Sequence, residues 1–197
     1  MIITIEGARH SGKTYLLNKF FEQNSNPRFK YYKWFLVDWL KILNLESREQ
    51  RADVHYLSIG NILTIFDQMH KDKETILVFD RSLITAYAWA ILRQRLTESR
   101  AQEELKLVLS SEVYKNIITI VIDPNPLYVK SNERHKDLFD SLSLFKDEYD
   151  VIDKLTLYNR PALSDPKLGN RFIQFNNEFD QVSIDSFIGL IDSFSNR

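Results

Sequence analysis

The chain has 197 residues, of which 44% are hydrophobic and 27% are charged, and its formal net charge is −1. This composition is typical of a globular protein of one domain that can bury a full core. Near-neutral charge provides no overall attraction toward nucleic acid or membranes, although a local basic patch could still provide one. The absence of cysteine excludes disulfides, thiolate metal sites and cysteine nucleophiles. With no signal-peptide pattern and no run of about 18–20 apolar residues, we expect a cytoplasmic protein.

Segments typical of strands and helices alternate along the chain, which predicts an α/β fold with a mostly parallel sheet. Helical crossovers between five strands predict a three-layer sandwich with helices on both faces of the sheet. In such sheets ligands bind at the carboxyl ends of the strands. The predicted strands are 2–6, 29–33, 75–80, 116–123 and 171–175, and the predicted helices are 13–23, 35–45, 54–70, 83–95, 102–114, 127–132, 138–158 and 184–194.

The first strand runs into an eight-residue loop that matches the phosphate-binding pattern G-x-x-x-x-G-K-[ST] at every position. Glycines let backbone N–H groups curl around phosphates, and the following helix adds the dipole of its N-terminus. Lys13 would reach the β- and γ-phosphates, and Thr14 would offer its hydroxyl to Mg²⁺. A chance match in a glycine turn is the alternative. We predict an ATP site in a P-loop NTPase fold, formed by Gly7, Ala8, Arg9, His10, Ser11, Gly12, Lys13 and Thr14.

A second candidate lies where the third predicted strand ends, in Asp80-Arg81-Ser82. A carboxylate at this position lies beside the phosphate loop and can hold Mg²⁺ directly or through water. Capping of the following helix is the structural alternative for Asp80. Arg81 suits an anionic or hydroxyl-bearing acceptor better than it suits a water molecule. The motif therefore predicts transfer of a phosphoryl group to a substrate rather than hydrolysis, with Lys13, Asp80 and Arg81 as catalytic residues.

With both motifs in view, the chain resembles the thymidylate kinase and deoxynucleoside kinase group of P-loop kinases. Residues 5–7 are similar to the start of the loop in both branches. Residues 80–82, followed by Thr85, Ala86 and Tyr87, are similar to the D-R-Y…S…A-Y stretch of thymidylate kinases and to the E-R-S or D-R-S of deoxynucleoside kinases. The resemblance implies an ATP- and magnesium-dependent phosphotransferase.

The resemblance also implies a domain plan. We expect a single kinase domain over 1–197, with a helical acceptor-binding insertion at about 34–72 and a lid at about 131–140. The lid is implied by the charged stretch 132–137, in which Arg134 is the best catalytic candidate because a planar guanidinium suits phosphate oxygens. A solvated charged turn is the alternative.

Three departures from the family patterns concern the acceptor. Arg9 replaces an Asp of the thymidylate kinase loop, and it could act as an internal arginine finger or point into solvent. Gln68 takes the place of an acceptor-site arginine, where it could read a base edge or be a polar residue on a helix surface. The Glu that deoxynucleoside kinases carry after their second strand is missing, and Asp38, a few residues later, could be a general base for a hydroxyl acceptor or a charge on a helix surface. The acceptor-binding candidates are Asp38, Gln68, Arg81 and Tyr87, the last of which could stack on a base or belong to the core.

The hypothesis that the sequence favours is a (deoxy)nucleoside monophosphate kinase of thymidylate kinase type. A monophosphate brings its own anionic nucleophile and needs no protein base, in agreement with the missing Glu. The alternatives are a deoxynucleoside kinase, a kinase of polynucleotide ends or DNA bases, and a P-loop switch that binds nucleotide without transferring phosphate. The expected partner is a nucleotide or nucleoside. Nucleic acid is not favoured, no membrane partner is expected, and a homodimer is compatible with the aromatic surface residues.

Overall fold

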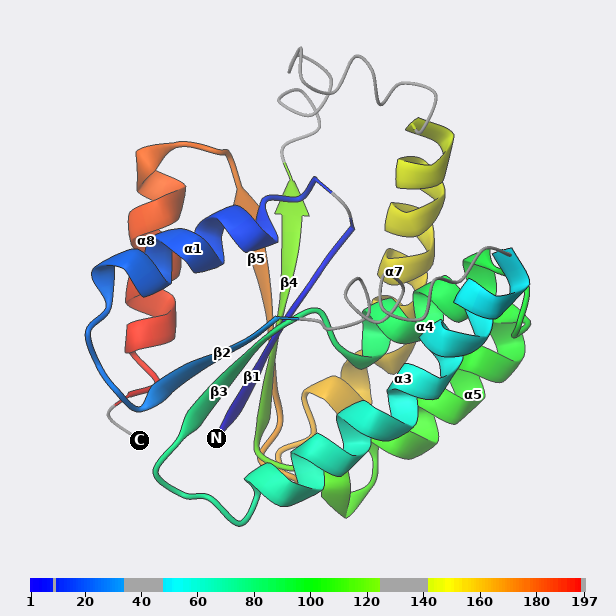
Figure 1. The fold of residues 1–197 in the computed structure, drawn as a ribbon, viewed down its shortest axis with the longest axis horizontal. Coiled ribbons are helices and arrows are strands. Elements are labelled where there is room, and N and C mark those ends of the chain that lie inside the picture. The colour runs from blue at the N-terminus through cyan, green and yellow to red at the C-terminus, as the bar shows by residue number, and fades with distance from the viewer. Residues whose placement is uncertain (9, 34–47, 125–141, 196–197) are drawn as a thin grey trace.

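The protein is described by a computed structural model that covers residues 1–8, 10–33, 48–124 and 142–195. Its centre is a five-stranded sheet in which every strand pairing is parallel (Figure 1). The strand order is β2-β3-β1-β4-β5. The strands are β1 (Ile2–Glu6), β2 (Phe29–Lys33), β3 (Ile76–Asp80), β4 (Ile117–Pro124) and β5 (Arg171–Asn177).

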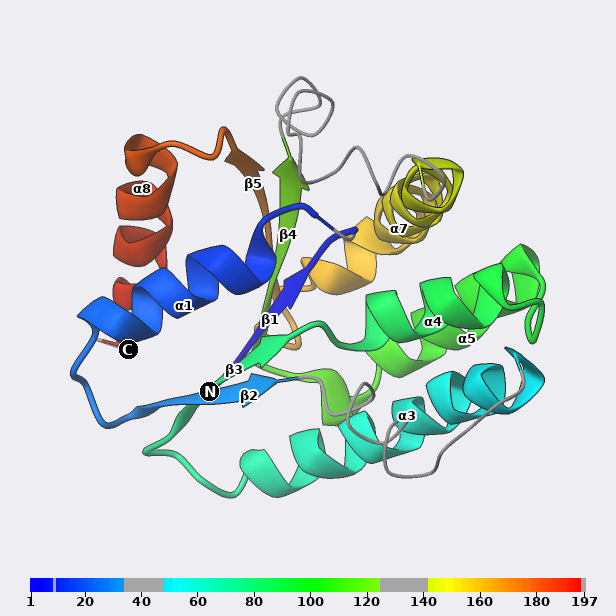
Figure 2. The same ribbon diagram turned by 45° about the horizontal axis from the view of Figure 1, so that its top comes forward.

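Helices cover both faces of the sheet, and this confirms the predicted three-layer fold (Figure 2). The helices α1 and α8 cover one face, and α3, α4, α5 and α7 lie on the other. None of the helices within the described ranges is both long and apolar enough to cross a bilayer. The helices are α1 (Lys13–Gln23), α3 (Arg48–Met69), α4 (Leu83–Leu92), α5 (Glu98–Leu109), α7 (Leu142–Leu163) and α8 (Gln181–Asp192), and a 3₁₀ turn spans Glu112–Tyr114.

The strands and α1 agree closely with the sequence predictions, whereas other helix bounds differ. The helix predicted at 102–114 begins earlier, at Glu98, because the Thr97 hydroxyl accepts a hydrogen bond from the Arg100 amide and caps it. It also ends earlier, and the 3₁₀ turn replaces its last residues. The helices predicted at 35–45 and 127–132 lie outside the described residues.

The central strand β1 is buried on both faces, as its apolar sequence predicts. Ile3 and Ile5 pack in the cluster under α1 and α8, whereas Ile2 packs in the cluster on the opposite face. Because side chains alternate along a strand, Glu6 also faces the side of α4. A charged residue is thereby placed at the end of a buried strand, next to the phosphate loop.

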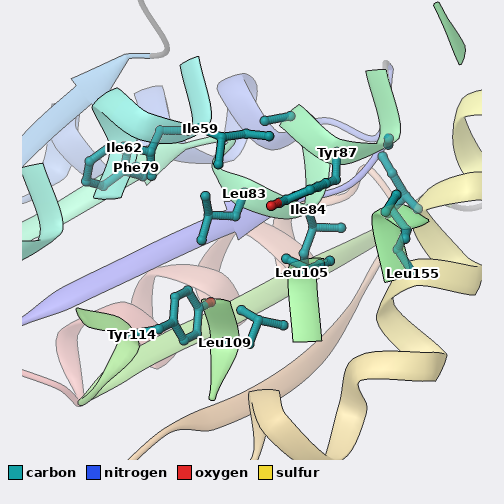
Figure 3. Close-up of a cluster of buried hydrophobic side chains, with 14 of the residues drawn as sticks. Ile59, Ile62, Phe79, Leu83, Ile84, Tyr87, Leu105, Leu109, Tyr114 and Leu155 are labelled. Atoms are coloured by element: carbon teal, nitrogen blue, oxygen red, sulfur yellow. The ribbon is translucent and has the colours of Figure 1, made fainter. Parts of the chain in front are cut away.

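The helix α4 is buried almost all round, from Leu83 to Ala90. It lies between α3, α5 and α7, and its side chains join the larger core cluster (Figure 3). A helix that is apolar on all sides has one stable position, in the interior of the fold. Its N-terminus is therefore fixed at the carboxyl end of β3, where Asp80 and Arg81 lie.

Candidate active site

The phosphate loop connects β1 to α1, and the neighbouring strands require its two motif glycines. Gly7 has φ +136°, and a Cβ there would lie 2.7 Å from the carbonyl oxygen of Ile122 in β4. Gly12 has φ +85°, and a Cβ there would lie 2.3 Å from Nδ2 of Asn177. Both positions thus combine a left-handed backbone with a close approach that only glycine permits. The loop closes against the sheet as tightly as phosphate binding by backbone amides demands.

Lys13 begins α1 with its side chain folded into the loop. The side chain is 3% exposed, and its ammonium donates hydrogen bonds to the Ala8 carbonyl and, at 3.0 Å, to the Ser11 hydroxyl. Burial, followed by the positive charge of Arg81, lowers the pKa of Lys13 from 10.5 to about 7. Both acceptors are neutral oxygens, and a bound polyphosphate would supply the opposite charge that stabilises the ammonium.

This low pKa leads to a prediction about MgATP binding. At pH 7.5 the Lys13 amine of the free protein is mostly neutral. A bound polyphosphate would raise its pKa, so we expect binding to take up roughly half a proton or more. Titration calorimetry in phosphate and in Tris buffers, which differ in ionisation enthalpy, measures this number. The uptake should disappear at pH 5.5, where Lys13 is already protonated, and equal binding enthalpies in both buffers at pH 7.5 would contradict the prediction.

Thr14 and Asp80 meet at the predicted magnesium position. The Thr14 hydroxyl donates to Asp80 Oδ2 at 2.7 Å, and the Tyr31 hydroxyl donates to the same oxygen at 3.1 Å. Burial, followed by the negative charge of Asp80, raises the pKa of Tyr31 well above its ordinary value, so the phenol stays a donor. Asp80 is 5% exposed, and its Oδ1 is buried without a hydrogen bond from any residue that the structure describes. A buried carboxylate oxygen without a donor, beside a hydroxyl of the phosphate loop, fits the oxygen ligands that Mg²⁺ prefers.

Arg81 follows Asp80 in a strained conformation. Its φ of +75° is uncommon for a residue other than glycine, and its N–H donates to the Ile5 carbonyl at 2.9 Å. Its Nη1 donates to Glu148 Oε1 on α7, also at 2.9 Å. Strained residues persist where several contacts hold them, and they cluster at functional sites. The strain therefore supports a functional role for Arg81.

Glu6 joins the phosphate loop to the start of α4. Its side chain is fully buried and accepts hydrogen bonds from the Ser82 hydroxyl at 2.8 Å, from the amides of Ile84 and Thr85 at 3.2 Å each, and from the Thr85 hydroxyl at 2.5 Å. A carboxylate at a helix N-terminus satisfies free amides and is stabilised by the helix dipole. Sequence reasoning gave Glu6 no role at the site. The signal was a single charged residue at the end of an otherwise apolar strand.

Asn177, the last residue of β5, fixes the loop from the other side. It is 1% exposed, its Nδ2 donates to the Ser11 carbonyl at 2.9 Å, and its Oδ1 accepts from the Phe179 amide at 3.0 Å. The bond to Ser11 orients the peptide that leads into Gly12, whose amide belongs to the predicted phosphate site. An asparagine at a strand end is common, so the sequence carried no signal for this role.

We expect Asn177→Ala to raise the KM for ATP by about threefold to tenfold, since a hydrogen bond to the loop is worth about 0.5–1.5 kcal/mol. Initial rates at varied ATP concentration measure the change. The matched control is Asn176→Ala, because Asn176 is the exposed neighbour on the same strand. Equal KM values for the two variants would contradict the role of Asn177.

The structure does not bring two of the predicted acceptor residues to this site. Gln68 is exposed near the end of α3, where the adjacent His70 Nε2 lies 2.8 Å from the Val113 carbonyl just before β4. That end of α3 lies at the amino ends of the strands, opposite the phosphate loop. Tyr87 is 3% exposed and packs in the core with Ile84 (Figure 3), so the core alternative is the correct one. Arg9, Asp38 and Arg134 lie outside the described residues.

Neither a protein-family model nor a curated protein sequence matches the chain. Solved structures do match. The thymidylate kinase from Ehrlichia chaffeensis is 17% identical with a TM-score of 0.60, over 98% of this chain and 97% of that one. The chain has the thymidylate kinase fold. Thymidylate kinase from Candida albicans is 15% identical with a TM-score of 0.60, over 100% of this chain and 93% of that one.

The same P-loop kinase fold relates the chain to the NadR protein in complex with NR. The two are 12% identical with a TM-score of 0.62, over 100% of this chain and 50% of the NadR chain. Both kinds of neighbour thus match this chain over nearly all of its length. The thymidylate kinase fold accounts for the three-layer architecture and for the place of the phosphate loop after β1.

The described site residues form three chemical groups at the carboxyl ends of β1, β3 and β5. The buried Lys13, protonated when a polyphosphate is bound, and the loop amides can bind a polyphosphate. A hydroxyl and a carboxylate oxygen without a donor can bind a divalent cation. A held guanidinium can stabilise charge on a transferred group or on its acceptor.

Proposed function

We propose that the protein is an ATP- and Mg²⁺-dependent phosphotransferase that acts on a nucleotide or nucleoside. The observation that carries the proposal is the buried Asp80 Oδ1, which has no donor among the described residues and lies in the carboxylate that accepts from Thr14. Lys13, which precedes Thr14 in the phosphate loop, is also buried. Arg81 follows Asp80 where a second carboxylate would favour hydrolysis, so the arrangement supports transfer to a substrate.

In the reaction, an oxygen of the acceptor attacks the γ-phosphorus of ATP while the bond from that phosphorus to the bridging oxygen of the β-phosphate breaks and ADP leaves. A hydroxyl acceptor would also release its proton, either to Asp38 as the candidate base or to solvent. Mg²⁺ held by Thr14 and Asp80 would draw charge from the phosphate oxygens. The loop amides and Lys13 orient the phosphates and neutralise their charge. Arg81 stabilises the negative charge on the phosphoryl group as it passes from ATP to the acceptor. Catalysis is then mainly positioning and electrostatics.

A nucleoside monophosphate is the first candidate acceptor. Its phosphate is already an anionic nucleophile, so the missing Glu after β2 is no obstacle. The fold similarity to thymidylate kinases supports the same choice.

A nucleoside is the second candidate, and Glu148 favours it. This buried carboxylate lies 2.9 Å from Arg81 Nη1 and offsets the positive charge that would attract a second phosphate. A neutral hydroxyl acceptor would not be repelled by Glu148.

The test is an acceptor panel with MgATP: nucleosides, nucleoside monophosphates and an oligonucleotide with a free 5′-hydroxyl. ADP and the phosphorylated product are both quantified. The proposal predicts product with at least one nucleoside or monophosphate, at a rate far above ATP hydrolysis alone. Product with the oligonucleotide alone would favour the polynucleotide kinase alternative. ATP binding without turnover, or phosphate release without any acceptor, would overturn the proposal in favour of a nucleotide-dependent switch.

The proposal includes a cytoplasmic location and a homodimer. Sedimentation equilibrium tests the homodimer, for which the expected mass is twice that of the 23.3 kDa chain.

A further inference from the structure

Glu148 joins α7 to Arg81 through a buried ion pair. The Glu148 side chain is fully buried and that of Arg81 is 19% exposed. The two residues are 67 positions apart in the sequence. A fully buried carboxylate needs a partner that offsets the loss of its hydration, and the guanidinium of Arg81 provides one.

The position of Glu148 follows from the packing of α7. Glu148, Ile152, Leu155 and Asn159 recur at helical spacing, and all four are buried. They form the stripe through which α7 packs toward the core and α4. Glu148 is the first residue of this stripe along α7, and the N-terminal end of α7 lies toward the carboxyl ends of the strands (Figure 1). An apolar contact there would serve packing alone, whereas the carboxylate contacts the functional arginine.

Stability does not account for this pair. The cost of desolvating two buried charges largely cancels their attraction, so apolar residues at such positions are often as stable or more so. The pair instead orients the guanidinium of Arg81. A guanidinium has five N–H donors in one plane, and the bond from Nη1 to Glu148 directs that plane through one of them.

The backbone of Arg81 is already fixed at two points. Its own amide donates to Ile5, and the next residue, Ser82, donates through its hydroxyl to Glu6. These bonds fix the position of the Arg81 backbone, but they do not fix the position of its guanidinium. Glu148 supplies a third contact, to the guanidinium itself.

We propose that Glu148 is the positioning residue of Arg81 in phosphoryl transfer to the acceptor, an inference that rests on the proposed function. Glu148 acts through Arg81. Its removal therefore changes transfer and the use of the acceptor, and it leaves ATP binding by the phosphate loop nearly unchanged.

A double-mutant cycle tests this role. Wild type, Glu148→Gln, Arg81→Gln and the double variant are assayed with MgATP and the acceptor that reacts fastest in the panel. We expect Glu148→Gln to lower kcat/KM for the acceptor by about tenfold to a hundredfold, since a misplaced group costs about that much. The KM for ATP should change by less than about threefold. In the Arg81→Gln background the second substitution should cost nothing further, because the group that it positions is gone.

The matched control is Asp147→Asn, which removes a carboxylate from an exposed position on the same turn of α7 and should leave the rates unchanged. If Glu148→Gln does not fold, Glu148→Asp keeps the charge, shortens its reach and should show the same loss in kcat/KM. An equal loss from Glu148→Gln in both Arg81 backgrounds would overturn the proposal.

A measurement without turnover separates this inference from the proposed function. In protein labelled with ¹⁵N-arginine, the Arg81 Nε–H order parameter should be high in the wild type and should fall in Glu148→Gln. An unchanged order parameter would overturn the positioning role even if transfer is observed. A fall in the order parameter without any transfer would refute the proposed function and leave the contact confirmed.

Discussion

Replacement of Lys13 by methionine should abolish phosphoryl transfer while the fold persists. Lys13 would place a charge among the phosphates, and its loss should lower kcat/KM by at least about a thousandfold. Since the substitution also replaces a buried polar amine, whose pKa burial has already lowered, with an apolar side chain, the melting temperature should stay the same or rise. Coupled assays of ADP formation and calorimetric melting measure the two quantities.

The matched control is Lys19→Met, on the same helix. Lys19 forms an exposed ion pair with Glu22 at 2.8 Å, so its loss should leave both the rate and the melting temperature nearly unchanged. A Lys13→Met protein with the activity of the wild type would refute the assignment of the phosphate loop.

Replacement of Glu6 by alanine should have the largest effect on stability. It leaves the buried donors of Ser82, Ile84 and Thr85 without their acceptor at the start of α4. We expect a loss of about 3–5 kcal/mol in the free energy of unfolding. For a chain of this size that corresponds to a fall of about 6–20 °C in melting temperature. Urea unfolding followed by circular dichroism measures the free energy directly.

Two further variants serve as comparisons for the loss of stability in Glu6→Ala. Glu6→Gln keeps an acceptor oxygen at the same position and should lose clearly less stability than Glu6→Ala. Glu22→Ala removes an exposed carboxylate and should cost less than about 1 kcal/mol. If Glu6→Ala and Glu22→Ala unfold at the same urea concentration, the buried network does not stabilise α4 as argued.

The sheet and the phosphate loop could be predicted because their signals are local. The buried run of β1 is β-branched at four of its five positions, and the G-x-x-x-x-G-K-[ST] pattern lies between a strand and a helix. Asp80 was predictable for the same reason, since a parallel sheet brings the ends of β1 and β3 together. In each case the position of a residue in the fold follows from the residues next to it in the sequence.

The residues that were missed or misplaced depend on contacts far along the chain. Asn177 reaches Ser11 across 166 positions, and Glu148 reaches Arg81 across 67. Gln68 was aligned with a family residue by its sequence neighbour alone, and α3 carries it to the amino ends of the strands, away from the phosphate loop. For Tyr87 the sequence left open stacking on a base or a place in the core, and the burial of α4 from Leu83 to Ala90 decides for the core.

Equilibrium dialysis with radiolabelled ATP tests the central claim most directly, namely that Lys13, Thr14 and Asp80 bind one MgATP. We predict one ATP per wild-type chain with Mg²⁺, and affinity at least about tenfold weaker with EDTA or in Asp80→Asn, since Mg²⁺ would join the phosphate oxygens to Thr14 and Asp80 and offset their charge. Lys13→Met should show no saturable binding in the same range. No ATP retained by the wild type, or equal retention by all three proteins, would contradict the account.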